Sequence, residues 1–148
     1  MIDPGTTQIT ELDPTNSEQV QFLYINSEAE IRYGLELASR YNFVPSFAIY
    51  EPGFLRLGAT LSKNTEGCPR PIYRFMFSDK LSFGFPAEKI YLLAYIDLLK
   101  QINPEAVWMI AGLQVNLRGI VSTCLEAGGH IRTGLEDSYF YSETANLE

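Results

Sequence analysis

Short apolar segments alternate with amphipathic segments along this chain at a spacing of about 30 residues, the length of one strand-plus-helix unit. The apolar segments that predict strands are residues 47–50, 72–77, 106–112 and 131–135. Strands that alternate with helices run parallel and are buried on both faces. The order therefore predicts an α/β fold on a parallel sheet, and 148 residues suit one domain, residues 1–148.

Helices are expected between these strands. The clearest begins at Ser27, because Ser27 and Glu30 have the spacing of a capping box and apolar residues then recur on one face. The expected helices span residues 27–42, 53–63, 86–101 and 115–127, with Pro86 in a first turn. Residues 1–20, rich in Pro, Gly, Thr and Asp, predict a strand end or a loop.

The length leaves two architectures open. A complete (β/α)8 barrel needs roughly 250 residues, so this chain has room for four or five of the eight strands. A doubly wound sheet of the same length would be complete, and spacing does not decide between the two.

Charge and composition exclude several classes of function. The chain has 11 basic and 18 acidic residues, a net charge of -7, which disfavours binding to nucleic acid or to an anionic membrane. No apolar run approaches the roughly 18 residues of a membrane span, and the first residues lack the features of a signal peptide, so we expect a cytoplasmic protein. Cys68 and Cys124 lie too far apart for a zinc or redox motif and are expected to be inert thiols.

Polar residues directly after the predicted strands are the candidate functional residues, because sites of parallel α/β folds gather there. Glu51 follows the first of these strands, and Arg132, Glu136 and Asp137 belong to the last. Two adjacent carboxylates can bind a divalent cation with one and take a proton with the other, and Arg132 can pair with a substrate carboxylate. The alternative is an exposed acidic loop with Arg132 in a solvated ion pair.

Other candidates favour structural roles. His130 is the single histidine, so a metal bound here would need most of its ligands from outside this chain. Trp108 lies within an apolar strand and is expected in the core, and Gly128-Gly129 suits a helix end better than a phosphate loop. No nucleophile elbow is present.

The segment from Gly128 to Asp137, GGHIRTGLED, resembles the GGHVRVGLED signature of the beta-keto acid cleavage enzymes. Further similarities follow in the family's order along nearly the whole chain. They are D-P-G-T at residues 3–6, Y-I-N-S at 24–27, Y-E-P-G-F-L at 50–55, F-G-x-P at 83–86 and W-x-x-A-G at 108–112.

The resemblance implies a TIM barrel of about twice this length. It also implies a zinc-dependent exchange in which a beta-keto acid and acetyl-CoA give acetoacetate and a new acyl-CoA. By position in the signature, Glu136 resembles a zinc-binding carboxylate, Asp137 a catalytic carboxylate, and Arg132 a group on the substrate or on that carboxylate. Glu51 keeps an acidic position before Pro-Gly and is expected to bind substrate.

Two departures accompany the resemblance. The family's other zinc ligands, a His-x-His pair, are absent, and Ala48 stands where members tend to carry an acidic residue. We therefore expect the C-terminal portion of a barrel, about five strands, open and lacking the first strands and the last helix. Such a chain is expected to bind zinc weakly or not at all, to be inactive alone, and to self-associate or need a complementing half-barrel. The alternative is an inactive remnant that serves as an α/β binding or interaction module.

Overall fold

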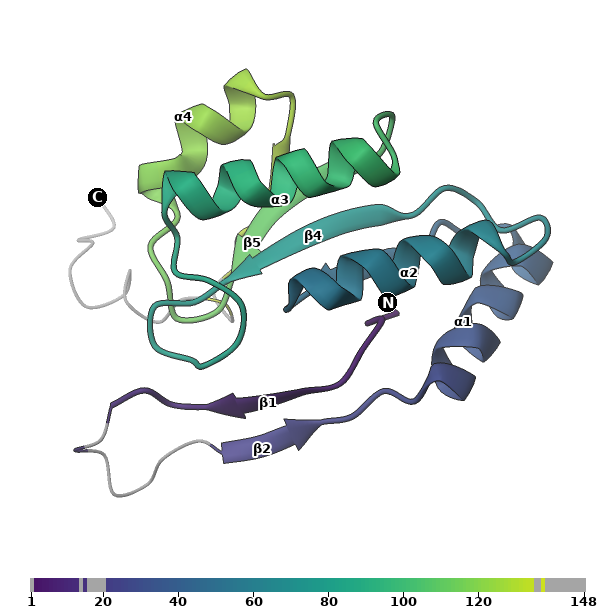
Figure 1. The fold of residues 1–148 in the computed structure, drawn as a ribbon, viewed down its shortest axis with the longest axis horizontal. Coiled ribbons are helices and arrows are strands. Elements are labelled where there is room, and N and C mark those ends of the chain that lie inside the picture. Colours follow the sequence, from purple (N-terminus) through teal and green to yellow (C-terminus); the bar gives the residue numbers. More distant parts are fainter. Residues whose placement is uncertain (1, 14, 16–20, 135–136, 138–148) are drawn as a thin grey trace.

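The computed structural model describes residues 2–13, 15, 21–134 and 137. Within these residues, four parallel strands form one sheet in sequential order (Figure 1). The strands are β3 (Ser46–Ile49), β4 (Ile72–Phe77), β5 (Val107–Gly112) and β6 (His130–Ile131). The connecting helices are α2 (Pro52–Lys63), α3 (Lys89–Ile102) and α4 (Arg118–Glu126). The α/β prediction is confirmed, and the sequential strand order is compatible with part of a TIM-like fold.

The N-terminal region differs from the prediction. We expected about five parallel strands, but the described part of residues 1–24 contains an antiparallel pair, β1 (Thr7–Thr10) and β2 (Gln21–Tyr24). Ile2 lies beside β3 and donates its N–H to the Ser46 carbonyl at 3.1 Å. The ladder does not continue, because Pro4 has no backbone N–H and the chain turns there.

Helix α1 (Glu28–Tyr41) confirms the first helix prediction, including its capping box. The Ser27 hydroxyl accepts from the Glu30 N–H, and the Glu30 carboxylate accepts from the Ser27 N–H at 2.8 Å. No helix in the described ranges is long and apolar enough to cross a membrane.

Two predicted helices begin later than expected. Helix α3 begins at Lys89 instead of Pro86, because the Phe85 carbonyl accepts from the Ser78 N–H at 3.1 Å and holds this segment beside β4. Helix α4 begins at Arg118 instead of residue 115. The Asn116 side chain accepts from the Arg118 N–H at 3.0 Å and marks the start of that helix.

The two faces of the sheet carry different side chains, because successive residues of a strand point to opposite faces. On β4, Tyr73, Phe75 and Phe77 belong to the large core that the helices cover. Arg74 and Met76 alternate with them and lie on the opposite face, which we call the inner face. A second, smaller apolar cluster lies there and contains Ile9, Ala48, Met76, Leu81, Phe83 and Ala111. The inner face therefore holds the N-terminal hairpin and the polar groups described next.

Candidate functional site

Arg132 and Asp137 lie at the carboxyl end of the sheet, where the chain leaves β6. Arg132 extends the ladder beyond β6 by donating its N–H to the Ile110 carbonyl at 2.9 Å. The Asp137 carbonyl accepts from the Gln114 N–H at 2.7 Å. Backbone bonds to β5 and to the loop after it thus position both residues.

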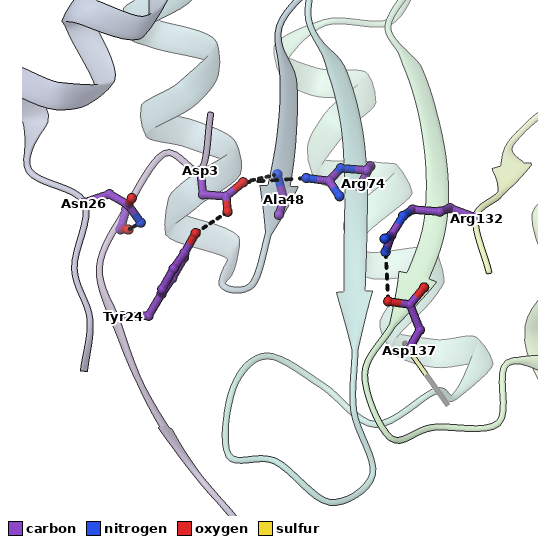
Figure 2. A network of polar contacts seen from close by, with 8 residues as sticks. Asp3, Tyr24, Asn26, Ala48, Arg74, Arg132 and Asp137 are labelled. Atoms are coloured by element: carbon purple, nitrogen blue, oxygen red, sulfur yellow. Dashed lines mark hydrogen bonds and ion pairs between the residues drawn. The ribbon is translucent and has the colours of Figure 1, made fainter. Parts of the chain in front are cut away.

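The two side chains form an ion pair (Figure 2). Arg132 Nη1 donates to Asp137 Oδ1 at 3.0 Å, and the Asp137 side chain is only 6% exposed, compared with 33% for Arg132. Asp137 Oδ2 is buried and has no hydrogen-bond partner among the described residues. A cavity of about 330 Å³ borders the pair and is also lined by Gly112 and Val115. Asp137 therefore differs from a carboxylate in a solvated surface pair, because its side chain is buried and one of its oxygens accepts no hydrogen bond from the described residues.

Glu51 lies at the carboxyl end of β3 and connects three segments of the chain. Its Oε1 accepts from the Thr7 hydroxyl at 3.2 Å and from the Gly84 N–H at 3.1 Å. Gly84 has a φ of 56°, and a Cβ there would lie 2.5 Å from the Tyr50 carbonyl oxygen. Glu51 thus holds the hairpin and the loop after β4 at the sheet edge, and its expected contact with substrate stays a prediction.

The metal prediction rests on Glu136, which lies outside the described residues. Among the residues that the structure does describe, no three His, Cys, Asp or Glu side chains are close enough together to hold a metal ion. Asp137, the nearest carboxylate in sequence, contacts Arg132. The described donor set therefore does not fit a zinc site.

A second polar cluster on the inner face was not predicted (Figure 2). Its centre is Asp3, which is 5% exposed. Asp3 Oδ1 accepts from the Ala48 N–H at 3.1 Å, and Oδ2 accepts from the Tyr24 hydroxyl. Arg74 Nη2 lies 3.6 Å from Asp3 Oδ1, in an ion pair with both side chains buried. Asp3 thereby joins the N-terminus, β2, β3 and β4.

Burial dominates the electrostatics of this cluster. It lowers the pKa of Arg74, an effect that nearby Asp3 opposes and Arg132 reinforces. Burial raises the pKa of Tyr24, and the bond to Asp3 raises it further. Burial likewise raises the pKa of Tyr50, whose hydroxyl interacts with the charges of Asp3 and Arg74. Both phenols are therefore neutral at neutral pH, and the Tyr24 hydroxyl donates to Asp3.

One sequence signal pointed to this cluster. Arg74 interrupts the apolar strand IYRFMF, and a charge within a buried strand requires a partner or a ligand. Asp3 carried no comparable signal, since the Asp3-Pro4-Gly5 sequence is equally typical of a surface turn.

The structure has a parallel sheet, and a buried carboxylate paired with an arginine lies at the carboxyl end of its strands. These features define the class of α/β proteins whose functional site lies at that edge of the sheet. Comparison with known sequences narrows the class. Residues 1–148 match the family described as beta-keto acid cleavage enzyme, and the chain belongs to that family. A segment of 55 residues is 38% identical to 3-oxoadipate:acetyl-CoA acetyltransferase of Cupriavidus necator. That match covers 37% of this chain and 19% of the relative.

Proposed function

We propose that this chain carries part of the active site of an enzyme that exchanges acyl groups between a beta-keto acid and acetyl-CoA. The observation that carries the proposal is the ion pair between Arg132 and the buried Asp137, which lies within the segment that resembles the family signature. The partial relative, whose name specifies an oxo acid and acetyl-CoA, supports the same pair of substrates.

Asp137 is proposed as the catalytic carboxylate. Conversion of acetyl-CoA and a keto acid into acetoacetate and a new acyl-CoA breaks one carbon–carbon bond and forms another, and this requires proton transfer at carbon. The Arg132 guanidinium orients the carboxylate through Oδ1. Oδ2, without a partner among the described residues, is the atom that would accept the proton. Arg132, one-third exposed, can also contact the substrate carboxylate.

A complementing polypeptide is part of this proposal. The zinc site would combine Glu136 with ligands from the complementing half-barrel, because the described donor set does not suffice. The chain alone is expected to be inactive.

The test mixes the purified chain with the N-terminal half of a related enzyme, zinc, acetyl-CoA and a panel of beta-keto acids, and measures acetoacetate. We expect acetoacetate only from the mixture. Asp137→Asn should lower the rate by roughly 100-fold or more, while Arg56→Lys, at an exposed position on α2, should leave it unchanged. Acetoacetate from the chain alone would contradict the need for a complementing half. A correctly assembled mixture without any activity would favour the alternative of an inactive binding module.

A further inference from the structure

A cavity of about 590 Å³ lies at the end of the sheet opposite to Arg132 and Asp137. It is bordered by the last turns of α2, the segment before β4 and the residues that follow α3, and both helices end beside the beginning of β4 (Figure 1). The buried Tyr73 forms part of the wall and belongs to the core beneath the helices. The volume is in the range of small-molecule sites, and the proposed reaction does not use this end of the sheet.

Arg70 lines this cavity from a stiff segment of the chain. Pro69 and Pro71 flank it, and a proline fixes its own φ and restricts the residue before it. The Ile72 N–H donates to the Pro45 carbonyl at 2.9 Å and fixes the end of this segment beside the chain that enters β3. The Arg70 side chain is exposed and forms no ion pair or hydrogen bond with the residues that the structure describes. Its backbone therefore has little freedom to lose when the guanidinium binds a ligand.

Lys63 adds a second cation to the same cavity. It lies in the last turn of α2, is exposed, and likewise has no ion pair within the described part of the chain. The net charge of the whole chain is -7, which disfavours anions in general, so two unpaired cations beside one cavity stand out locally. Together they balance the charge of a phosphate monoester, and a guanidinium can bind two phosphate oxygens at once.

The opposite side of the cavity has a different chemistry. Asn103 and Glu105 line it after the end of α3, and a carboxylate accepts hydrogen bonds from hydroxyl groups. Glu105 would repel a phosphate placed directly against it, so a phosphate and its hydroxyl groups should occupy different ends of the cavity. Apolar surface from Pro69, Pro71 and Ile102 completes the lining. The cavity thus suits a ligand with a phosphate, hydroxyl groups and a flat body of low polarity.

We propose that this cavity binds a nucleoside monophosphate as a ligand distinct from the substrates of the proposed reaction. Arg70 and Lys63 bind its phosphate. Glu105 accepts from the ribose hydroxyls, and the base packs against Pro69 and Pro71. The nucleotide takes no part in bond making.

Cys68 provides a reporter within the cavity. It lines the wall and is partly buried, whereas Cys124 is fully buried. Burial raises the pKa of the Cys68 thiol, so alkylation is followed at pH 8, where more thiolate is present. We expect AMP to slow the alkylation of Cys68 in the full chain. Adenosine and inorganic phosphate, tested separately, should protect only at much higher concentration.

Calorimetric titration with the same three probes measures the affinities. AMP should bind about tenfold or more tightly than adenosine or inorganic phosphate, because each of these lacks half of the contacts. Arg70→Met should remove this preference, while Arg40→Met, at an exposed position on α1 outside the cavity, should retain it. Dideoxy-AMP, which lacks both ribose hydroxyls, should bind more weakly than AMP to the wild type. In Glu105→Ala the two nucleotides should bind equally.

Equal affinity for AMP and inorganic phosphate, or AMP binding that survives Arg70→Met, would overturn the proposal. Loss of AMP binding in Arg132→Met but not in Arg70→Met would place the nucleotide at the candidate site and would also overturn it. Arg70 is exposed, so its replacement should leave the fold intact, and circular dichroism checks this. The titrations use neither zinc nor a keto acid, so their result is independent of the acetoacetate assay.

Discussion

Asp3 and Arg74 form one ion pair, but they differ in the other hydrogen bonds that their side chains make with the described residues. Asp3 accepts hydrogen bonds from the Ala48 N–H and the Tyr24 hydroxyl, so its charge is satisfied without the arginine. Arg74 has no such alternative, because two of its nitrogens lack partners among the described residues. When a buried pair is broken, the cost depends on which charge is left uncompensated.

Replacing either partner should therefore have different effects on the free energy of unfolding. Asp3→Ala strands a buried guanidinium and should cost about 3 kcal/mol. Arg74→Met leaves Asp3 with two donors and replaces the cation with an apolar side chain of similar length, so it should cost only about 1 kcal/mol. Urea unfolding of the two variants and of the double variant measures these values. A larger loss for Arg74→Met than for Asp3→Ala would contradict this account.

At the scale of the elements, the two ends of a helix are stabilised by different local interactions. Helix α1 begins with the reciprocal bonds of Ser27 and Glu30. Helix α4 ends in a Schellman motif, in which Gly128 N–H donates to the Leu125 carbonyl and Gly129 N–H donates to the Cys124 carbonyl. These interactions involve residues close in sequence, which is why both were recognisable before the structure was known.

The capping box should make stability depend on acid pH. Hydrogen bonds from Ser27 lower the pKa of Glu30 below its ordinary value of 4.5. The contribution of the Glu30 carboxylate to the free energy of unfolding is therefore present above the pKa that this group has in the unfolded state. It is lost as the pH falls through the lower pKa of the folded state. The difference in the free energy of unfolding between pH 6 and pH 3, measured with urea, should be smaller for Glu30→Gln than for the wild type. Glu36→Gln, at an exposed position of the same helix, should retain the wild-type difference.

Substitution by alanine should change the free energy of unfolding by different amounts at the two glycines that follow α4. Gly128 has a φ of 82° with open space around it, so Gly128→Ala should cost about 1 kcal/mol through backbone strain. At Gly129 a Cβ would lie 2.3 Å from the Trp108 ring, and the resulting overpacking should cost about 2 to 3 kcal/mol. Trp108 is the only tryptophan, so its fluorescence should change in Gly129→Ala alone. Equal effects of the two variants would argue against this packing.

For the whole molecule, one face of the sheet is well covered and the opposite side exposes apolar groups. Helices α2, α3 and α4 lie over one face, whereas the hairpin β1–β2 extends along the other side (Figure 1). Phe22 and Leu23 of β2 are 46% and 63% exposed, and Ile25 just beyond the strand is 63% exposed. Exposed apolar groups on a two-stranded hairpin favour association with another chain.

We therefore expect the purified chain to self-associate. In sedimentation velocity, the average mass of the wild type should rise with concentration over the micromolar range. Leu23→Lys should shift the distribution toward monomer, because a charge on the hairpin opposes burial. Leu125→Lys, at an exposed position on α4, is the matched control and should behave as the wild type. A wild type that stays monomeric at all concentrations would refute this expectation.

The local elements of the fold were largely predictable because their determinants lie within a few residues. The strand at residues 72–77 was predicted with the bounds that the structure has, and the buried position of Trp108 was predicted correctly. The N-terminal hairpin was missed, because its contacts with Ala48, Leu81 and Ser82 join segments far apart in the sequence. The later starts of α3 and α4 were missed for a related reason, since the backbone bond from β4 to Phe85 and the side-chain bond of Asn116 override the helical pattern.

Hydrophobic periodicity and turn residues determined the α/β class, the order of the helices and parallel strands and the candidacy of Arg132 and Asp137, since periodicity and strand ends can be recognised along a single chain. Only the tertiary structure decided that Arg132 forms an ion pair with a buried Asp137 and that Asp3 faces Arg74. Burial and pairing depend on which strands become neighbours. Asp3 and Arg74 are far apart in the sequence, and they meet because Ala48, which donates its N–H to Asp3, pairs with Arg74 in the sheet.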